Sequence, residues 1–67
     1  MDPKLRINIH IGQKVKVVQK KDQRSGELTV GRVVRILTNS SNHPWGIKVM
    51  IDGGIVGRVQ EIVEDIE

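Results

Sequence analysis

The 67-residue sequence contains no cysteine, alanine, phenylalanine or tyrosine, and Trp45 is its single aromatic residue. The absence of cysteine excludes a disulfide framework. With only His10 and His43 as further candidate ligands, the usual structural zinc sites are excluded as well. One aromatic residue is too few for the aromatic walls of a proline-binding groove. We therefore expect no metal, no cofactor and a protein of the reducing cytoplasm.

Long hydrophobic runs are also missing. No stretch approaches the roughly 20 apolar residues of a membrane span, and none has the apolar core of a secretion signal. We expect neither membrane insertion nor secretion. A chain of this length fits one domain that buries roughly 60% of its surface on folding. Functional residues should therefore lie on the surface, and no small-molecule substrate is evident.

Isoleucine and valine dominate the apolar residues, with 19 residues between them against 3 leucines. β-branched side chains fit a pleated surface, whereas the missing alanine and scarce leucine deprive helices of their best formers. The composition therefore predicts an all-β fold.

Alternating apolar residues and turn-forming residues predict the positions of the strands. The expected strands are residues 14–19, 29–37, 46–51 and 55–59, separated by polar loops at 20–26 and 38–45. A flexible N-terminal arm is expected over residues 1–8, followed by a single small β-barrel domain over residues 9–67. Within residues 29–37 the apolar residues do not keep a period of two, which predicts a bulge or a strong bend. Gly31 is the expected bend.

The C-terminal segment has two interpretations. Val59, Ile62, Val63 and Ile66 have the spacing of one helical face. Residues 57–66 also resemble the end of SH3 domains, where a strand enters a 3₁₀ turn and then a short closing strand. We favour the second interpretation, because four strands alone would leave an unpaired edge. The expected fold is then a five-stranded SH3-like barrel with a 3₁₀ or short helical turn near the C-terminus.

A three-residue hairpin loop at 52–54 sets the register of the last two long strands. It pairs Ile51 with Ile55, Val49 with Gly57 and Ile47 with Val59 on the core face. A two-residue loop would place Arg58 on the core face, where an unpaired charge costs several kcal/mol. The three-residue register also sets Lys48 opposite Arg58 on the outer face. Two like charges there repel unless both side chains extend into water or an anion binds between them.

No residue pattern supports catalysis. His10 and His43 lie in no nucleophilic signature, and Asp22, Glu27 and Asp52 are typical of capped turns. His43 is expected to order its own loop through a backbone hydrogen bond. We do not expect an enzyme.

Charge is distributed unevenly along the chain. Residues 1–58 hold all 11 basic residues against four acidic ones, a balance of +7, and the other four acidic residues lie in the C-terminal segment. This asymmetry favours a polyanionic partner. In the loop at 20–26, Lys20, Lys21 and Arg24 are candidates for phosphate contacts and Gln23 for base edges or sugar. The alternative for these residues is an ordinary solvated turn.

Trp45 also has two interpretations. It can stack on a base, as in single-stranded nucleic-acid binding. It can also fill one end of a barrel that has no other large side chain, and we favour this plug because tryptophan is highly buried on average.

Several motifs resemble known families. Ile9-x-x-Gly12-x-x-Val15 and Gly31-Arg-Val-Val-Arg-Ile36 look like the opening of SH3-like barrels of the KOW and Tudor kind. There are four further segments: residues 22–31, Ile36-Leu-Thr-x-Ser40, His43-Pro-x-Gly-Ile-Lys-Val49 and Gly54-x-Val-Gly-Arg-Val59. Together they resemble the YwbE-like family of small uncharacterised prokaryotic proteins. The resemblance implies a cytoplasmic β protein and supplies no catalytic residues. Met50 stands where a second basic residue after Lys48 is expected.

These observations predict a non-catalytic binding module. The expected partner is RNA, or DNA, and the expected nucleic-acid-binding residues are Lys20, Lys21, Gln23, Arg24, Trp45, Lys48 and Arg58. The alternative is a protein–protein interaction module that uses the polar loops of the barrel rim. The fold alone does not decide between the two.

Overall fold

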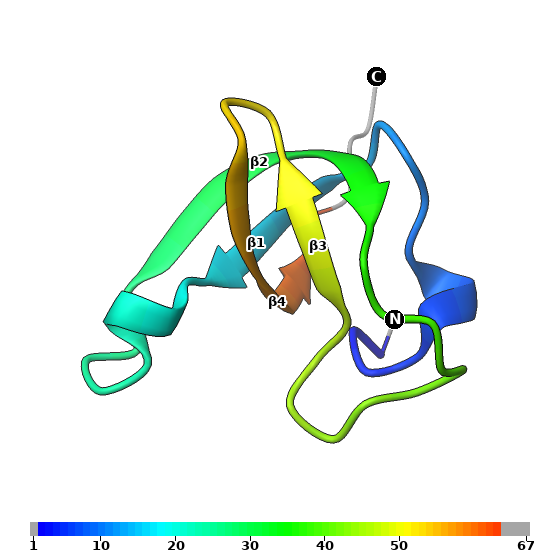
Figure 1. The fold of residues 1–67 in the computed structure, drawn as a ribbon, viewed down its shortest axis with the longest axis horizontal. Coiled ribbons are helices and arrows are strands. Elements are labelled where there is room, and N and C mark those ends of the chain that lie inside the picture. The colour runs from blue at the N-terminus through cyan, green and yellow to red at the C-terminus, as the bar shows by residue number, and fades with distance from the viewer. Residues whose placement is uncertain (1, 64–67) are drawn as a thin grey trace.

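The computed structural model describes residues 2–63, which form an all-β protein (Figure 1). Its strands are β1 (Lys14–Val18), β2 (Leu28–Ile36), β3 (Lys48–Ile51) and β4 (Ile55–Ile62). Two 3₁₀ helices, η1 (Arg6–Asn8) and η2 (Lys20–Asp22), precede β1 and β2 respectively. No α-helix occurs within residues 2–63, as the composition predicted.

The four strands form one antiparallel sheet whose order, β1-β2-β3-β4, closes on itself. β1 pairs with β2 on one side and with β4 on the other, so that the first and last strands are neighbours. The long strands β2 and β4 curve around the interior (Figure 1). The closed order removes the unpaired edge that had favoured a fifth strand.

The predicted five strands are wrong for the described residues, because β4 itself closes the sheet. Val59 pairs with Val17, whereas Glu61 pairs with Lys16, so the register shifts by one residue at Gln60. This β-bulge leaves Gln60 and Glu61 both exposed between Val59 and the half-buried Ile62. The bulge explains the helix-like spacing of the apolar residues. Residues 60–63 contain no 3₁₀ turn, and residues 64–67 of the predicted closing segment lie outside the described part.

A second bulge lies in β2, as the broken period predicted, but its position is Val34 and not Gly31. Val33 pairs with Ile51 and Arg35 with Met50, which leaves Val34 as the extra residue. Gly31 lies in regular pairing with Val15. A Cβ atom on Gly31 would lie 2.7 Å from Ile51 Cδ1, so this glycine allows β2 to pack closely against Ile51.

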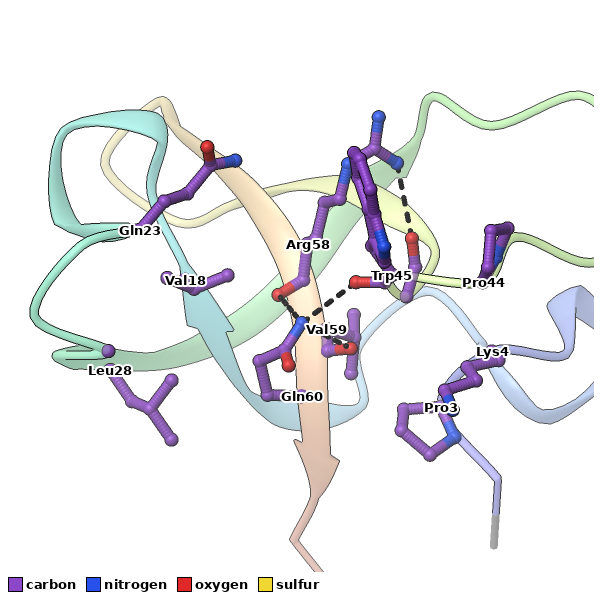
Figure 2. A pocket seen from close by; sticks show the side chains of 12 residues that line it. Pro3, Lys4, Val18, Gln23, Leu28, Pro44, Trp45, Arg58, Val59 and Gln60 are labelled. Carbon is purple, nitrogen blue, oxygen red and sulfur yellow. Dashed lines mark hydrogen bonds between the residues drawn. The ribbon is translucent and has the colours of Figure 1, made fainter.

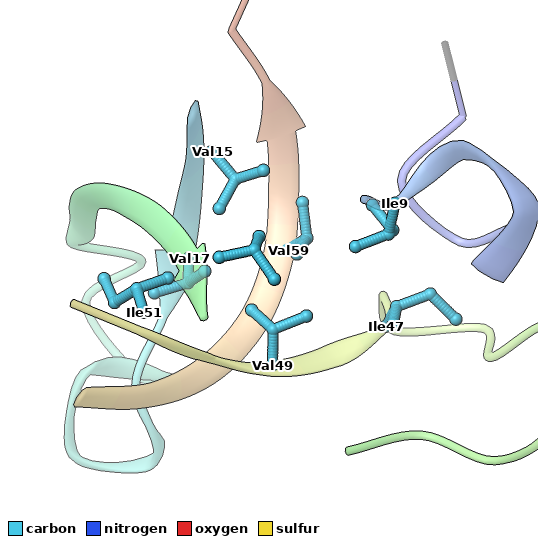
Figure 3. Packing of buried hydrophobic residues seen from close by; sticks show 8 residues of the cluster. Ile9, Val15, Val17, Ile47, Val49, Ile51 and Val59 are labelled. Atoms are coloured by element: carbon cyan, nitrogen blue, oxygen red, sulfur yellow. The ribbon is translucent and has the colours of Figure 1, made fainter. Parts of the chain in front are cut away.

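The interior of the closed sheet is filled by β-branched side chains alone (Figure 3). The eight buried residues are Ile9, Val15, Val17, Val33, Ile47, Val49, Ile51 and Val59. Trp45 is not among them: it is 71% exposed, and the predicted plug is therefore wrong. Isoleucine and valine side chains are large enough to fill the interior, because only four strands surround it.

The predicted hairpin register is confirmed. Ile51 pairs with Ile55 and Val49 with Gly57, across the three-residue loop at 52–54. Lys48 lies opposite Arg58, as expected. Gly57 is required at its position because a Cβ atom there would lie 2.8 Å from both Val17 Cγ2 and the Val18 carbonyl oxygen.

The N-terminal segment, predicted as a flexible arm, is hydrogen-bonded along the loop that precedes β3. The Pro3 carbonyl accepts from Ile47 N at 3.1 Å, and the Lys4 carbonyl accepts from His43 N at 2.9 Å. Leu5 forms an isolated β-bridge with Asn42. These contacts place residues 3–5 beside the loop that carries Trp45.

Candidate nucleic-acid interface

An open depression lies on the outer surface where β4, the N-terminal segment and the loop at 43–46 meet (Figure 2). We call it the Trp45 depression. Its volume is about 770 Å³. It is lined by twelve residues: Pro3, Lys4, Val18, Gln23, Gly26, Leu28, Pro44, Trp45, Gly46, Arg58, Val59 and Gln60.

The floor of the depression follows from the strand register. Leu28, Val18 and Arg58 line the depression and are successive partners across β2, β1 and β4, and Lys48 of β3 continues this row beyond the lining. Partners in a sheet share one face, so this row carries an apolar half and a basic half. Arg58 stands at the boundary between them and is half-buried.

The bulge in β4 brings a further residue into the depression. Gln60 is the extra residue, and its side-chain amide donates to the Trp45 carbonyl at 2.9 Å (Figure 2). Bulges commonly redirect a side chain in this way. Gln60 therefore ties β4 to the loop that carries Trp45.

Gly46 allows that loop to lie directly on β4. Its φ angle is +100°, and a Cβ atom there would overlap the Val59 carbonyl oxygen. Both conditions select glycine. The Gly46 carbonyl accepts a hydrogen bond from Arg58 Nη1 at 3.2 Å. Because Gly46 follows Trp45 in the sequence, this bond holds the guanidinium group against the loop that carries Trp45.

His43 orders the loop as predicted. Its Nδ1 accepts a hydrogen bond from Trp45 N at 3.2 Å, and its carbonyl accepts from Gly46 N at 3.1 Å. The imidazole ring also meets the indole in an edge-to-face arrangement, with ring centroids 6.2 Å apart.

The charge of the depression is positive. Lys4 and Arg58 are among its lining residues, and no aspartate or glutamate is. Within residues 2–63, Lys16 Nζ lies 3.5 Å from a Glu61 carboxylate oxygen, whereas no carboxylate pairs with Lys4, Lys48 or Arg58.

The structure brings together three of the seven predicted binding residues. Gln23, Trp45 and Arg58 line the depression, and Lys48 is the strand partner of Arg58. Lys20 and Lys21 lie in η2 and Arg24 in the following turn, all exposed and none of them lining the depression.

Sequence reasoning missed Lys4 and Gln60 as lining residues. Lys4 lies in a segment that was expected to be separate from the domain, and only its hydrogen bonds to the loop at 43–47 place it here. Gln60 lies in a segment whose apolar spacing favoured a turn or helix. The polar pair at 60 and 61, set between inward-facing Val59 and Ile62, is the signal of a bulge that identifies it.

Residues 2–63 contain no group of three histidine, cysteine, aspartate or glutamate side chains that could hold a metal ion. Among the same residues, no helix is long and apolar enough to cross a membrane.

The fold and the depression define a small all-β protein with a basic surface site beside an exposed tryptophan. The chain belongs to the family described as "Uncharacterized conserved protein (DUF2196)", whose model matches residues 2–62. It is similar to the uncharacterized protein YwbE of Bacillus subtilis (strain 168), with 48% identity over 63 residues. That match covers 94% of this chain and 97% of YwbE, which bears out the resemblance to YwbE-like proteins. No solved structure matches the chain.

Proposed function

We propose that the protein is a non-catalytic cytoplasmic module that binds RNA, or DNA, through phosphate contacts on a basic face. We further propose that its closed sheet is a variant of the SH3-like barrel, with four strands in place of five. The basic face comprises Arg58 and Lys48 on the sheet, Lys4 on the N-terminal segment, and Lys20, Lys21 and Arg24 at the loop after β1.

The observation that carries the proposal is the set of charges around Arg58. The strand register places Lys48 directly opposite Arg58, although like charges there destabilise the sheet by up to roughly 1 kcal/mol. Within residues 2–63 no carboxylate relieves this repulsion. A phosphate group between the two side chains would relieve it, and charge-assisted hydrogen bonds to phosphate are among the stronger polar contacts.

The proposal predicts a strong salt dependence. The affinity for a fluorescently labelled oligonucleotide, measured by anisotropy, should fall linearly with salt concentration on logarithmic axes, because each neutralised phosphate releases a counterion. An affinity that does not change with salt, or no binding in low salt, would contradict the proposal. In that case the protein-interaction alternative, in which the polar loops contact a protein, becomes the working hypothesis.

A further inference from the structure

We propose that the Trp45 depression is a subsite for a single-stranded polynucleotide, in which one base stacks on the Trp45 indole and an adjoining phosphate contacts Arg58. This inference rests on the proposed function and deepens it. Phosphate contacts alone do not distinguish a single strand from a duplex, whereas a stacking residue does.

The first support is the position of Trp45. The chain has one aromatic residue, and it lies 71% exposed while eight isoleucine and valine side chains fill the core. Its backbone is held on both sides, by the His43 imidazole at its nitrogen and by Gln60 at its carbonyl. A fixed backbone lowers the entropy lost when the indole binds a flat ligand.

The second support is the guanidinium group of Arg58. One of its five N–H donors bonds to the Gly46 carbonyl, and no other hydrogen bond or ion pair engages it within residues 2–63. Figure 2 shows that Arg58 and Trp45 extend toward the same side of β4. The remaining donors are therefore available to a phosphate whose base lies on the neighbouring indole.

The third support is the rest of the lining. Lys4 adds a positive charge, and no carboxylate lines the depression to repel a phosphate. Gln23 is exposed and lies across the depression from Trp45 in Figure 2, where its amide offers a donor and an acceptor to a base edge. The apolar surface of Leu28 and Val18 continues the floor beneath such a base.

A duplex does not satisfy this geometry. Paired bases are covered on both faces by their neighbours, so an indole reaches a base face only where the strand is unpaired. Stacking on an aromatic side chain tolerates any base, which predicts weak sequence preference.

The test uses the native fluorescence of the full chain, since Trp45 is its only tryptophan. The protein is titrated with a short single-stranded RNA, the matching single-stranded DNA, a duplex RNA of the same length and poly-glutamate. Quenching by either single strand, with little quenching by the duplex, supports the inference. The single strand that binds with the higher affinity shows whether the protein prefers ribose or deoxyribose. If the duplex quenches the Trp45 fluorescence as much as the single strands do, the single-strand subsite is wrong.

A variant separates this inference from the proposed function. Trp45→Leu should weaken binding of labelled single strands about tenfold and leave duplex affinity unchanged, because one stacked base is lost. Ile11→Ala is the matched control, since Ile11 is 64% exposed and does not line the depression. Circular dichroism checks that each variant is folded. If Trp45→Leu binds single strands normally and salt still weakens binding, the subsite is wrong and the proposed function stands. If only poly-glutamate binds, both are wrong and an acidic protein partner is indicated.

Discussion

Gly46 is the residue on which the position of Trp45 depends. It combines a positive φ angle with a contact to the Val59 carbonyl that leaves no room for a side chain. Gly53 in the β3–β4 hairpin has a similar φ angle, +85°, but no atom within 4 Å of a Cβ placed there. Substitution of Gly53 therefore tests backbone strain alone, whereas substitution of Gly46 tests strain together with a steric overlap.

Gly46→Ala is expected to lower the free energy of unfolding by about 2 kcal/mol or more, because strain and overlap add. Gly53→Ala should cost only about 1 kcal/mol, the strain of a left-handed conformation alone. Urea unfolding followed by circular dichroism measures both. Equal losses in the two variants would show that the loop moves away from β4 at little cost.

Lys48 and Arg58 are equivalent in the register but not in their contacts. Lys48→Thr removes the repulsion and no described side-chain contact, so the melting temperature should stay the same or rise by a few degrees. Arg58→Thr removes the same repulsion together with the hydrogen bond to the Gly46 carbonyl, worth about 1 kcal/mol, and should gain nothing. Thermal unfolding compares the two variants. Both variants should weaken oligonucleotide binding. Lys14→Gln is the control for loss of one positive charge, because Lys14 lies at the end of β1 opposite to Val18.

At the scale of elements, the loop that begins with η2 is the first test of the basic face. Lys20, Lys21 and Arg24 are exposed and have no ion pair within the described residues, so replacing all three with alanine should leave stability nearly unchanged. Affinity for a single strand should fall, and the slope of its logarithmic salt dependence should flatten by about 2 if each residue neutralises one phosphate. An unchanged slope would remove this loop from the binding surface.

The N-terminal segment is the second element to test. Deletion of residues 1–4 removes the carbonyl acceptors of His43 N and Ile47 N, and Ile47 is fully buried. An unsatisfied buried amide costs about 1 to 3 kcal/mol, so the midpoint of urea unfolding should fall by a corresponding amount. Lys4→Ala retains the carbonyl and should leave that midpoint in place. A deletion with wild-type stability would mean that these hydrogen bonds exchange freely with water.

The elements also show where sequence reasoning succeeds. The β3–β4 register was predictable, because only one loop length puts Gly57 inside and Arg58 outside. The bulge in β2 was predictable as a broken period, but its position was not, because two adjacent valines leave open which one is the extra residue. The end of β4 was missed, because a bulge between Val59 and Ile62 gives the same spacing as a helical turn.

The candidate site was only partly predictable. Arg58 follows from the hairpin register, Gln23 from its place in a polar loop, and His43 from turn chemistry. Trp45 was placed in the core because tryptophan is usually buried, but the interior of a closed four-stranded sheet is filled by residues no larger than isoleucine. Lys4 depends on contacts between segments roughly 40 residues apart in the sequence, which local patterns do not contain.

For the whole molecule, we expect circular dichroism and tryptophan fluorescence to respond differently to unfolding, because the tryptophan is already exposed in the folded state. Far-ultraviolet circular dichroism of the native protein should show strand without helix and should change fully on unfolding. Tryptophan emission should already be that of a solvent-exposed indole and shift only slightly, because Trp45 is 71% exposed before unfolding. Both are recorded along one urea titration. A large red shift of the emission on unfolding would mean that Trp45 is buried in solution.

The closed strand order has a final consequence for association. Every described strand has two neighbours, so none is an edge strand along its whole length, although residues 28–30 of β2 pair with β1 alone and Arg35 and Ile36 with β3 alone. Peptides that bind by adding a strand, and fibrils that grow by the same pairing, therefore find only these short stretches of β2 and no full-length edge. The 52–54 hairpin closes one end of the sheet and is suitable for labelling, because Gly53 and Gly54 are exposed and have open space around them.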